Sequence, residues 1–155
     1  MQIRDCMSGA VVTIAPEESA ALAARLLTRH NLGALPVCSY DGHLRGIVTD
    51  RDIITRCVAA DQDPSRVPVS DIMSRSPETV TPGDDPHAAA AKMAAHQVRR
   101  LPVVEEGKLV GMISLGDLAR SRKLDMEAAA ALSEISTNVK PRGRRGSAPD
   151  PASLL

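Results

Sequence analysis

The clearest shortage in this sequence of 155 residues is of aromatic side chains: there is no Trp and no Phe, and Tyr40 is the only aromatic residue. A hydrophobic core must therefore be built from Ala, Val, Leu, Ile and Met, and many of these smaller side chains must be buried together. Long hydrophobic runs are also missing. No stretch approaches the roughly 18 apolar residues of a membrane span, and the first residues lack the apolar segment of a signal peptide. We therefore predict a cytoplasmic protein with no membrane partner.

A charge excess of one sign is absent as well, since 19 Lys and Arg residues balance 19 Asp and Glu residues. A chain without net charge has no general electrostatic attraction to nucleic acids or membranes. The balance is uneven along the chain, because residues 136–155 carry four basic residues and one acidic residue. This basic tail has no aromatic side chains to stack on bases, so we expect no nucleic-acid partner.

The cysteines do not form an even, regularly spaced set: Cys6, Cys38 and Cys57 are three in number and irregularly placed. They therefore do not make a disulfide framework, and their spacing is not that of close metal ligands. A P-loop, a nucleophile with a neighbouring base and a pair of catalytic acids are missing too. The sequence predicts a protein that binds a ligand and is not an enzyme.

What the chain does contain is an internal repeat. Segments 5–8 and 35–37 recur 66 residues later as segments 71–74 and 101–103. One residue is then deleted before Gly107, where a turn tolerates the loss, and the offset becomes 65. We predict two copies over residues 4–61 and 70–122, joined by a linker over 62–69. At the second offset Gly42, Gly46, Thr49 and Asp52 match Gly107, Gly111, Ser114 and Asp117.

Each copy is predicted to fold as strand, helix, strand, strand and helix, which makes the fold class α/β (α+β). Helix starts are predicted at the caps Ser19 and Asp85, and Gly33 is predicted to end the first helix. The predicted strands are 11–14, 34–38, 44–49, 100–104 and 109–114; a helix follows over 50–60, a C-terminal helix over 123–135, and a disordered tail over 136–155.

The end of the last strand in each copy carries the most informative pattern. Thr49 is followed three residues later by Asp52, and Ser114 in the same way by Asp117. A helix that opens at the hydroxyl residue offers unpaired N–H groups to a phosphate, and a carboxylate one turn later can accept the two hydroxyls of a ribose. The same spacing is also close to a capping box that only starts a helix.

With these motifs in two ordered copies, residues 4–122 resemble a tandem pair of cystathionine-beta-synthase (CBS) domains, a Bateman module. The segments that carry the likeness are Leu-Pro-Val, Gly-Ile-Val-Thr-Asp-Arg-Asp-Ile and Gly-Met-Ile-Ser-Leu-Gly-Asp-Leu. The resemblance implies two β-α-β-β-α repeats packed with pseudo-twofold symmetry, with two clefts for adenosine ligands. It also implies that Thr49 and Ser114 contact phosphate, that Asp52 and Asp117 hold ribose, and that Thr13, Ala34, Thr79 and Arg100 wall the adenine.

The two clefts are predicted to differ. Arg51 is placed to neutralise phosphate in the first cleft, whereas Gly116 stands at that position in the second. Arg99 and Arg100 either supply charge to the second cleft or crowd it. We therefore expect the Thr49–Asp52 cleft to be the functional one.

The predicted ligand is AMP, ADP, ATP or S-adenosylmethionine, with no other cofactor and no metal. We expect a homodimer, formed through exposed aliphatic residues such as Ile53, Ile54 and Leu118, and a separate effector protein. The alternative hypothesis is an interaction scaffold that binds no nucleotide and is linked to redox or metal chemistry through its cysteines.

Overall fold

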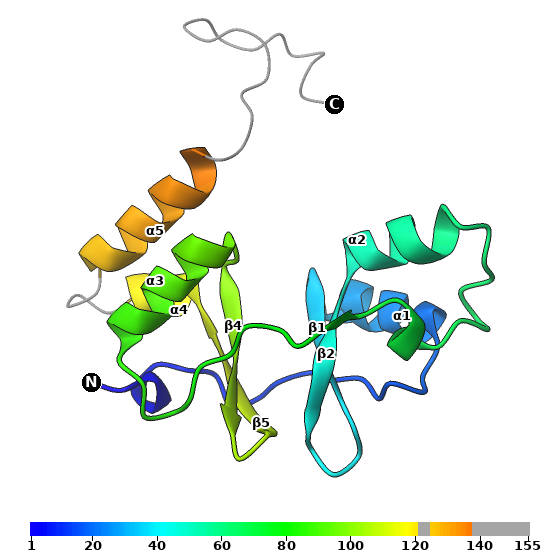
Figure 1. Cartoon of the computed structure of the whole chain (residues 1–155), viewed down its shortest axis with the longest axis horizontal. Helices are drawn as coiled ribbons and strands as arrows, with labels where there is room; N and C mark the ends of the chain where they lie inside the picture. Colours follow the sequence, from blue (N-terminus) through cyan, green and yellow to red (C-terminus); the bar gives the residue numbers. More distant parts are fainter. Residues whose placement is uncertain (121–124, 138–155) are drawn as a thin grey trace, which may run out of the picture.

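The computed structural model of this chain describes residues 1–120 and 125–137. The first copy contains η1 (Ile3–Asp5), α1 (Ala20–His30), β1 (Ala34–Cys38), β2 (Leu44–Thr49), α2 (Asp50–Ile53) and the π-helical turn η2 (Ile54–Val58). The second contains η3 (Val69–Asp71), β3 (Ser74–Arg75), α3 (Pro86–His96), β4 (Arg100–Glu105), β5 (Lys108–Ser114) and α4 (Leu115–Ala119), and α5 (Asp125–Thr137) follows. The strands lie in the centre, with α1 and α2 at one end and α3, α4 and α5 at the other (Figure 1). This mixture of helices and strands in two repeats confirms the predicted fold class.

The long helices begin at the predicted caps. The Ser19 hydroxyl accepts a hydrogen bond from the N–H of Leu22 at 3.1 Å, and the Asp85 carboxylate accepts one from the N–H of His87 at 2.9 Å. Each cap satisfies a donor that the first turn of a helix leaves without a partner. Pro86 stands at the first position of α3, where its missing N–H costs nothing.

The ends of the long helices differ from the prediction. Gly33 does not end α1, because the helix stops at His30 and Asn31 already adopts left-handed backbone with φ 53°. Gln97 does the same after α3, with φ 56°. Asn adopts this conformation more readily than most residues, so Asn31 ends the helix two positions before the glycine.

The two hairpins match the prediction closely. β1 and β2 have the predicted bounds, and β4 and β5 are each one residue longer. The predicted strand over 11–14 is wrong, because the segment meets β1 only where Ile14 bridges to Val37, and no ladder continues from that bridge. The helix predicted over 50–60 is divided, since η2 is closed by a wider i to i+5 bond from Ala59 N–H to Ile54 O at 2.8 Å.

The segments that lead into the two copies are exchanged. β3, which precedes α3, pairs with β2 of the first copy, with Ser74 opposite Ile47. Ser8, which precedes α1, bridges to Met112 in β5 of the second copy. Consistent with this, Figure 1 shows the N-terminal segment beside the second copy. Each copy therefore contributes one element to the other's sheet.

The exchange extends into the two hydrophobic cores. Ile3 is fully buried in the core of the second copy, whereas Val69 and Ile72 are buried in the core of the first. Aliphatic residues and methionine fill both cores, as the lack of aromatics requires. The first core includes Ile14, Ala20, Ala23, Leu27, Leu35, Val37, Val48, Ile53, Cys57 and Met73; the second includes Val80, Ala89, Ala90, Met93, Ala94, Leu101, Val103, Ile113, Leu115 and Leu118.

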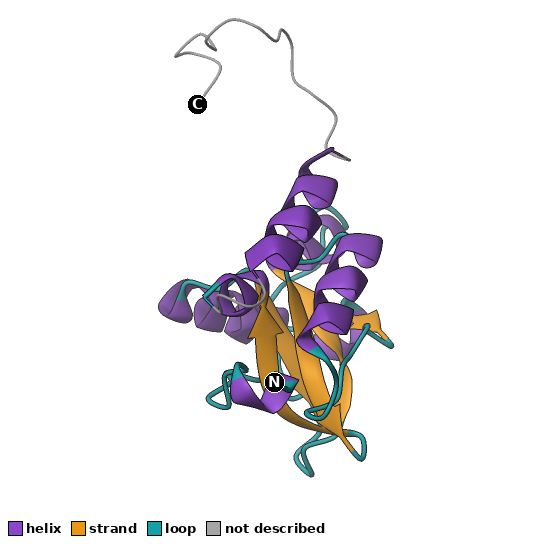
Figure 2. Ribbon diagram, turned by 90° about the vertical axis from the view of Figure 1, so that its left-hand side faces the viewer, coloured by secondary structure: helices purple, strands orange, loops and turns teal. Residues whose placement is uncertain are grey.

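The hairpin turns join the two copies at the end of the strands that lies away from the long helices. In Figure 2 the long helices lie above these turns. Leu44 N–H donates to Gly107 O and Leu109 N–H donates to Gly42 O, each at 3.0 Å. These reciprocal bonds relate the copies by an approximate twofold axis, because each uses equivalent positions of the repeat. Gly42 and Gly107 have φ of 91° and 81°, values that only glycine adopts without strain.

The C-terminal helix α5 packs against α3 and α4. Its residue Ala131 is 3% exposed and belongs to the core of the second copy, and Ile135 is 8% exposed. The helix is present as predicted, but it extends through Thr137, so residues 136 and 137 do not belong to a disordered tail. The rest of the predicted tail, residues 138–155, lies outside the described residues. Among the residues that are described, no helix combines the length and apolar character needed to cross a membrane.

Candidate functional site

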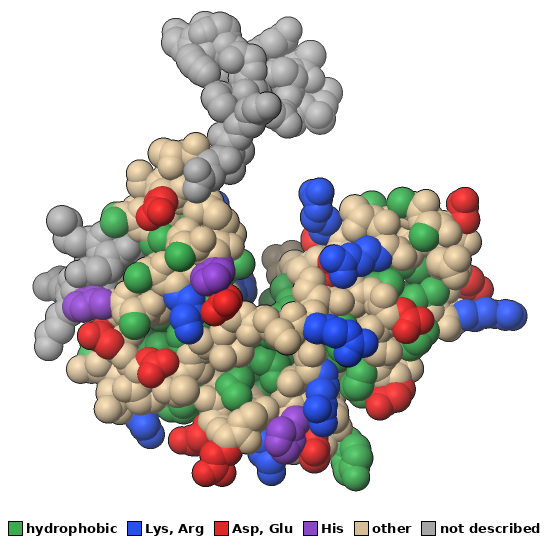
Figure 3. Space-filling view, in the orientation of Figure 1, with side chains coloured by type: hydrophobic (Ala, Val, Ile, Leu, Met, Phe, Trp, Pro, Cys, Tyr) green, Lys and Arg blue, Asp and Glu red, His purple; other side chains and the backbone are tan. Residues whose placement is uncertain are grey.

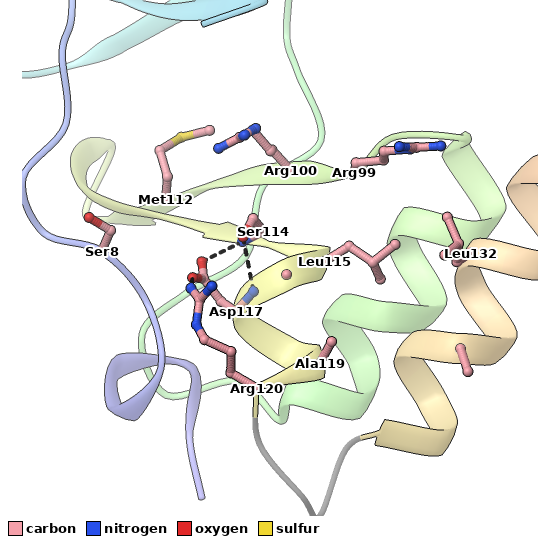
Figure 4. Close-up of a pocket in the computed structure, with 12 residues that line it drawn as sticks. Ser8, Arg99, Arg100, Met112, Ser114, Leu115, Asp117, Ala119, Arg120 and Leu132 are labelled. Carbon is pink, nitrogen blue, oxygen red and sulfur yellow. Dashed lines mark hydrogen bonds and ion pairs between the residues drawn. The ribbon is translucent and has the colours of Figure 1, made fainter. Parts of the chain in front are cut away.

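A cavity of about 930 Å³ lies at the second copy, where β5 ends and α4 begins. It is walled by the strands β4 and β5, by α4, by one face of α5 and by the leading segment of the first copy (Figure 4). Three parts of the chain that are far apart in sequence therefore meet around it. Its lining residues are Ser8, Arg99, Arg100, Met112, Ser114, Leu115, Gly116, Asp117, Ala119, Arg120, Ala129 and Leu132.

Ser114 and Asp117 form a reciprocal capping box inside this cavity. The N–H of Ser114 donates to Asp117 Oδ2 at 2.8 Å, and the N–H of Asp117 donates to Ser114 Oγ at 3.0 Å. The other carboxylate oxygen of Asp117, Oδ1, accepts a hydrogen bond from Arg120 Nη2. Both oxygens of the carboxylate are therefore engaged, one by the backbone and one by a side chain.

Thr49 and Asp52 form the same box in the first copy, with distances of 2.9 and 3.0 Å. Asp52 is 8% exposed, which makes it the one buried charged residue in the described part of the chain, and Arg56 Nε lies 3.8 Å from its Oδ1. The capping-box interpretation of the motif is thus confirmed in both copies.

Most of the N–H groups predicted to form a phosphate cradle have partners within the chain. At the first copy, the N–H of Asp50 donates to Gly33 O at 3.1 Å and the N–H of Arg51 donates to Asp50 Oδ1 at 2.8 Å. At the second copy, the N–H of Leu115 donates to Arg99 O at 2.8 Å. Together with the capping boxes, these bonds engage the N–H groups of residues 49–52 in the first copy and of Ser114, Leu115 and Asp117 in the second. Helices as short as α2 and α4 have little dipole to add.

The structure brings three of the predicted site residues together, since Arg100, Ser114 and Asp117 all line the cavity. Thr79 lies apart from it, and its carbonyl oxygen accepts a hydrogen bond from Lys92 Nζ at 2.7 Å. Among the predicted residues of the first copy, Thr13 and Arg51 are exposed, Ala34 is half-buried and Asp52 is buried.

The lining residues that were missed from the sequence include Ser8, Arg120, Ala129 and Leu132. Arg120 follows Asp117 by three residues, a spacing at which side chains meet on a helix, so this pair was detectable. The other three reach the cavity through tertiary packing and carried no sequence signal.

The cavity is basic. Arg99, Arg100 and Arg120 line it, and Asp117 is the one acidic residue in the lining. Figure 4 shows Arg120 lying across Asp117, and Arg100 extending from β4 on the side of Met112. We expected the first cleft to be the functional one because of Arg51, and left open whether Arg99 and Arg100 supply charge to the second. In the structure both line the cavity at the second copy, together with Arg120.

Two smaller cavities lie elsewhere. One of about 360 Å³ lies between α1 and α2, and one of about 220 Å³ lies between α3 and α5. Both are lined mainly by aliphatic side chains and contain none of the predicted site residues. Figure 3 shows several basic side chains in a row over the half of the molecule that holds α2 and the first hairpin, with acidic side chains beside them. The cavity at the second copy is therefore the strongest candidate site.

The aliphatic residues predicted to form a dimer surface have different environments. Ile53 and Leu118 are buried within their own copies, at 7% and 0% exposure, so they cannot contact a partner. Ile54 is 60% exposed, and Val58 on η2 is 54% exposed. The prediction was wrong for the first two residues because the short helices after β2 and β5 turn those faces inward.

The three cysteines are free thiols. Burial raises the pKa of Cys38, and burial together with the nearby Asp117 and Asp5 carboxylates raises the pKa of Cys6. Thiols with raised pKa values stay protonated at neutral pH, and the thiolate is the form that binds metals and reacts. Over residues 1–120 and 125–137, no cluster of three or more His, Cys, Asp or Glu side chains is arranged to hold a metal ion.

The fold and the cavity define a duplicated α/β module in which exchanged segments close each copy and one copy holds a polar, basic cavity. The CBS domain family model matches the chain twice, at residues 3–59 and 69–123. The chain therefore belongs to the CBS domain family, as the sequence motifs predicted, and consists of a tandem pair of CBS domains.

Curated relatives share most of the chain. The CBS domain-containing protein YhcV of Bacillus subtilis is 40% identical over 134 residues, which cover 86% of this chain and 94% of the relative. Hypoxic response protein 1 of Mycobacterium tuberculosis is 36% identical over 117 residues, covering 76% and 82%. Inosine-5'-monophosphate dehydrogenase of Korarchaeum cryptofilum, a relative named as an enzyme, is matched over only 21% of its length.

Solved structures resemble the fold over nearly their whole length. Hypoxic response protein I with two coordinated zinc ions superposes with a TM-score of 0.72 at 34% identity, covering 77% of this chain and 98% of that one. The CBS domain protein PAE2072 of Pyrobaculum aerophilum, complexed with AMP, gives 0.71 at 29% identity, covering 84% and 99%. The CBS domain pair of MJ0100, in complex with 5'-methylthioadenosine and S-adenosyl-L-methionine, gives 0.67 at 27% identity, covering 77% and 94%.

Proposed function

We propose that this protein is a regulatory module that binds an adenosyl ligand in the cavity at Ser114 and Asp117. The observation that carries the proposal is the meeting of a carboxylate, a hydroxyl and three arginines in one cavity of about 930 Å³. A volume of this size is within the range of small-molecule sites. Related CBS pairs have been crystallised with AMP and with S-adenosyl-L-methionine, which supports the adenosyl class.

Each part of the ligand has a suitable partner in the lining. The Asp117 carboxylate accepts hydrogen bonds from ribose hydroxyls. Ser114, Arg99 and Arg120 contact phosphate, and the side chains of Met112 and Leu115 lie against the base. We place Arg100 at the adenine end, on the strength of the family resemblance. The equivalent roles of Thr49 and Asp52 in the first copy remain part of the proposal, at a second and weaker site.

The protein responds to its ligand without catalysing a reaction. Ser8 comes from the leading segment of the first copy, and Leu132 comes from α5, so a ligand in the cavity contacts both. A ligand shifts a conformational equilibrium only when it binds the two states with different affinity. Contacts to three separate parts of the chain provide that difference, because any change in how the parts pack changes the cavity.

The signal passes to a homodimer partner or to a separate effector protein. The exposed aliphatic residues Ile54 and Val58 are our candidates for the dimer contact. Free thiols at Cys6, Cys38 and Cys57 fit the reducing environment of the cytoplasm, where we place the protein.

Isothermal titration calorimetry with AMP, ATP and S-adenosylmethionine tests the proposal. The wild type is expected to bind at least one of these ligands, and Asp117→Ala is expected to lose binding. Asp52→Ala removes the same capping carboxylate from the first copy; it is expected to remove only the weaker second site and to leave binding at the Asp117 cavity intact. Absence of binding by the wild type would refute the adenosyl module and favour the interaction scaffold, and equal affinities in wild type and Asp117→Ala would place the site elsewhere.

A further inference from the structure

Asp117 and Arg120 form an ion pair within the proposed ligand cavity. The Asp117 side chain is 13% exposed, whereas Arg120 is 75% exposed and reaches the carboxylate from the outer turn of α4. Because Asp117 Oδ2 is used by the capping box, Oδ1 is the oxygen available to a ribose hydroxyl, and Arg120 occupies it. A ribose hydroxyl that binds Asp117 at Oδ1 therefore competes with Arg120 for that oxygen.

The displaced guanidinium needs a new partner. An exposed side chain such as Arg120 turns readily, so it can leave the carboxylate without disturbing the core. A phosphate of the ligand is an anion that accepts paired hydrogen bonds from a guanidinium. A phosphorylated ligand therefore replaces the ion pair that it breaks, whereas an uncharged nucleoside does not.

The other two arginines of the cavity favour the same class of ligand. Arg99 and Arg100 are exposed and lie near the junction of α3 and β4. In the first copy, the positions equivalent to Arg99, Arg100 and Arg120 hold Gly33, Ala34 and Thr55. The basic lining is thus not a general property of the repeat but a feature of the second copy alone.

We infer that this cavity selects adenosyl ligands by charge, accepting phosphorylated nucleosides and rejecting the cationic S-adenosylmethionine, with Arg120 as the residue that sets the selection. The inference rests on the proposed function and narrows it. S-adenosylmethionine carries a sulfonium and an ammonium group, only one of which its own carboxylate offsets, where a nucleotide carries phosphate. Asp117 is the one carboxylate in the lining, and it is committed to the capping box and the ribose, so the cavity has no further anion to offset the remaining positive charge.

Calorimetry with four ligands tests the inference: ATP, AMP, adenosine and S-adenosylmethionine, each with the full-length protein. The expected order of affinity is ATP, then AMP, then adenosine, with S-adenosylmethionine no tighter than adenosine. Arg120→Gln is expected to weaken ATP binding about tenfold, the size of a lost charge-assisted hydrogen bond. The same variant is expected to bind adenosine more tightly than the wild type does, because Oδ1 of Asp117 is then free.

These opposite effects separate selection by charge from damage to the fold, because a damaged fold would lower the affinity for both ligands. Arg25→Gln, an exposed arginine on α1 outside the cavity, is the matched control and should bind every ligand as the wild type does. ATP affinity that falls with added salt while adenosine affinity stays constant would add support. Two results would overturn the inference and leave the proposed function standing. One is an affinity for S-adenosylmethionine equal to that for AMP, and the other is an equal loss of affinity for ATP and adenosine in Arg120→Gln. A wild type that binds none of the four ligands would overturn both.

Discussion

Ser8 and Met112 exchange two backbone hydrogen bonds, each N–H donating to the other's carbonyl oxygen at 2.9 Å. The residues are 104 positions apart in the chain, and the pair fastens the leading segment of the first CBS domain to the sheet of the second. Ser74 and Ile47 make the reciprocal contact. Because each domain is completed by a segment of the other, we expect the pair to unfold as one cooperative unit.

The first prediction concerns the glycines beneath the exchanged segments. A Cβ on Gly111 would lie 2.7 Å from Ser8 O, and one on Gly46 would lie 2.5 Å from Ser74 O. Both contacts are with backbone, which cannot yield as a side chain does. We expect Gly111→Ala and Gly46→Ala each to lower the free energy of unfolding by about 1–3 kcal/mol, as measured by urea denaturation. Gly33→Ala is the control, since nothing lies within 4 Å of its Cβ, and a loss equal to the control's would contradict the prediction.

A second prediction concerns Ile3, which lies near the start of the chain but is fully buried in the second domain's core. Ile3→Ala leaves a cavity there and is expected to cost about 2–5 kcal/mol of unfolding free energy. Hydrogen exchange should show the loss of protection first in β4 and β5, not in β1 and β2. Tyr40→Ala shortens a large side chain that is fully exposed, and its cost should be small. If the amides of β1 and β2 exchanged earlier than those of β4 and β5 in Ile3→Ala, the N-terminal segment would belong to its own copy.

A third prediction divides the roles of two residues of α5. Ile135 is 8% exposed and packs inward, whereas Leu132 is 41% exposed and lines the ligand cavity. Ile135→Ala is expected to lower stability by about 2 kcal/mol. Leu132→Ala is expected to leave stability nearly unchanged and to weaken nucleotide binding, because it removes an apolar contact from the cavity wall. Thermal unfolding and calorimetry on both variants give the test, and equal ligand affinities in Leu132→Ala and wild type would refute the role of α5 at the site.

The fourth prediction concerns pH. The hydroxyl of Ser39 and the N–H of His43 donate hydrogen bonds to the Asp41 carboxylate, and together they lower its pKa from 3.8 to about 2. Since the folded pKa lies below the unfolded one, the charged form stabilises the hairpin turn. That stabilisation is fully present above the unfolded pKa and is lost as the pH falls from about 4 toward 2.

Nuclear magnetic resonance of the Asp41 carboxyl carbon measures this pKa directly. Ser39→Ala removes the larger of the two causes and is expected to raise the pKa toward 3.8. The pKa of Asp84, which is lowered by hydrogen bonds from the backbone and hydroxyl of Thr81, serves as an internal control and should not move. An unchanged Asp41 value in Ser39→Ala would show that the hydroxyl does not hold the carboxylate.

Much of the local structure could be predicted because its causes are local. Ser19 and Asp85 cap helices through N–H groups two or three residues away, and the alternation between apolar runs and glycine-containing turns marks β1 and β2. The repeat, and with it the CBS family, follows from matching residues alone. The capping boxes at Thr49 and Ser114 also close over three residues, so their spacing was sufficient to predict them.

The sequence by itself therefore determined the two copies, their elements and the family to which they belong. Only the tertiary structure decided that Ser8 and Ile3 belong to the second domain, because pairing at a separation of about a hundred residues depends on how both domains pack. It also placed the basic cavity at the second copy: Arg99, Arg100, Arg120 and Leu132 come from four different elements or junctions, and only folding brings them together. It also decided which N–H groups at the helix starts have partners. The N–H groups of Asp50 and Leu115 donate to Gly33 O and Arg99 O, which are distant in sequence and adjacent only in space.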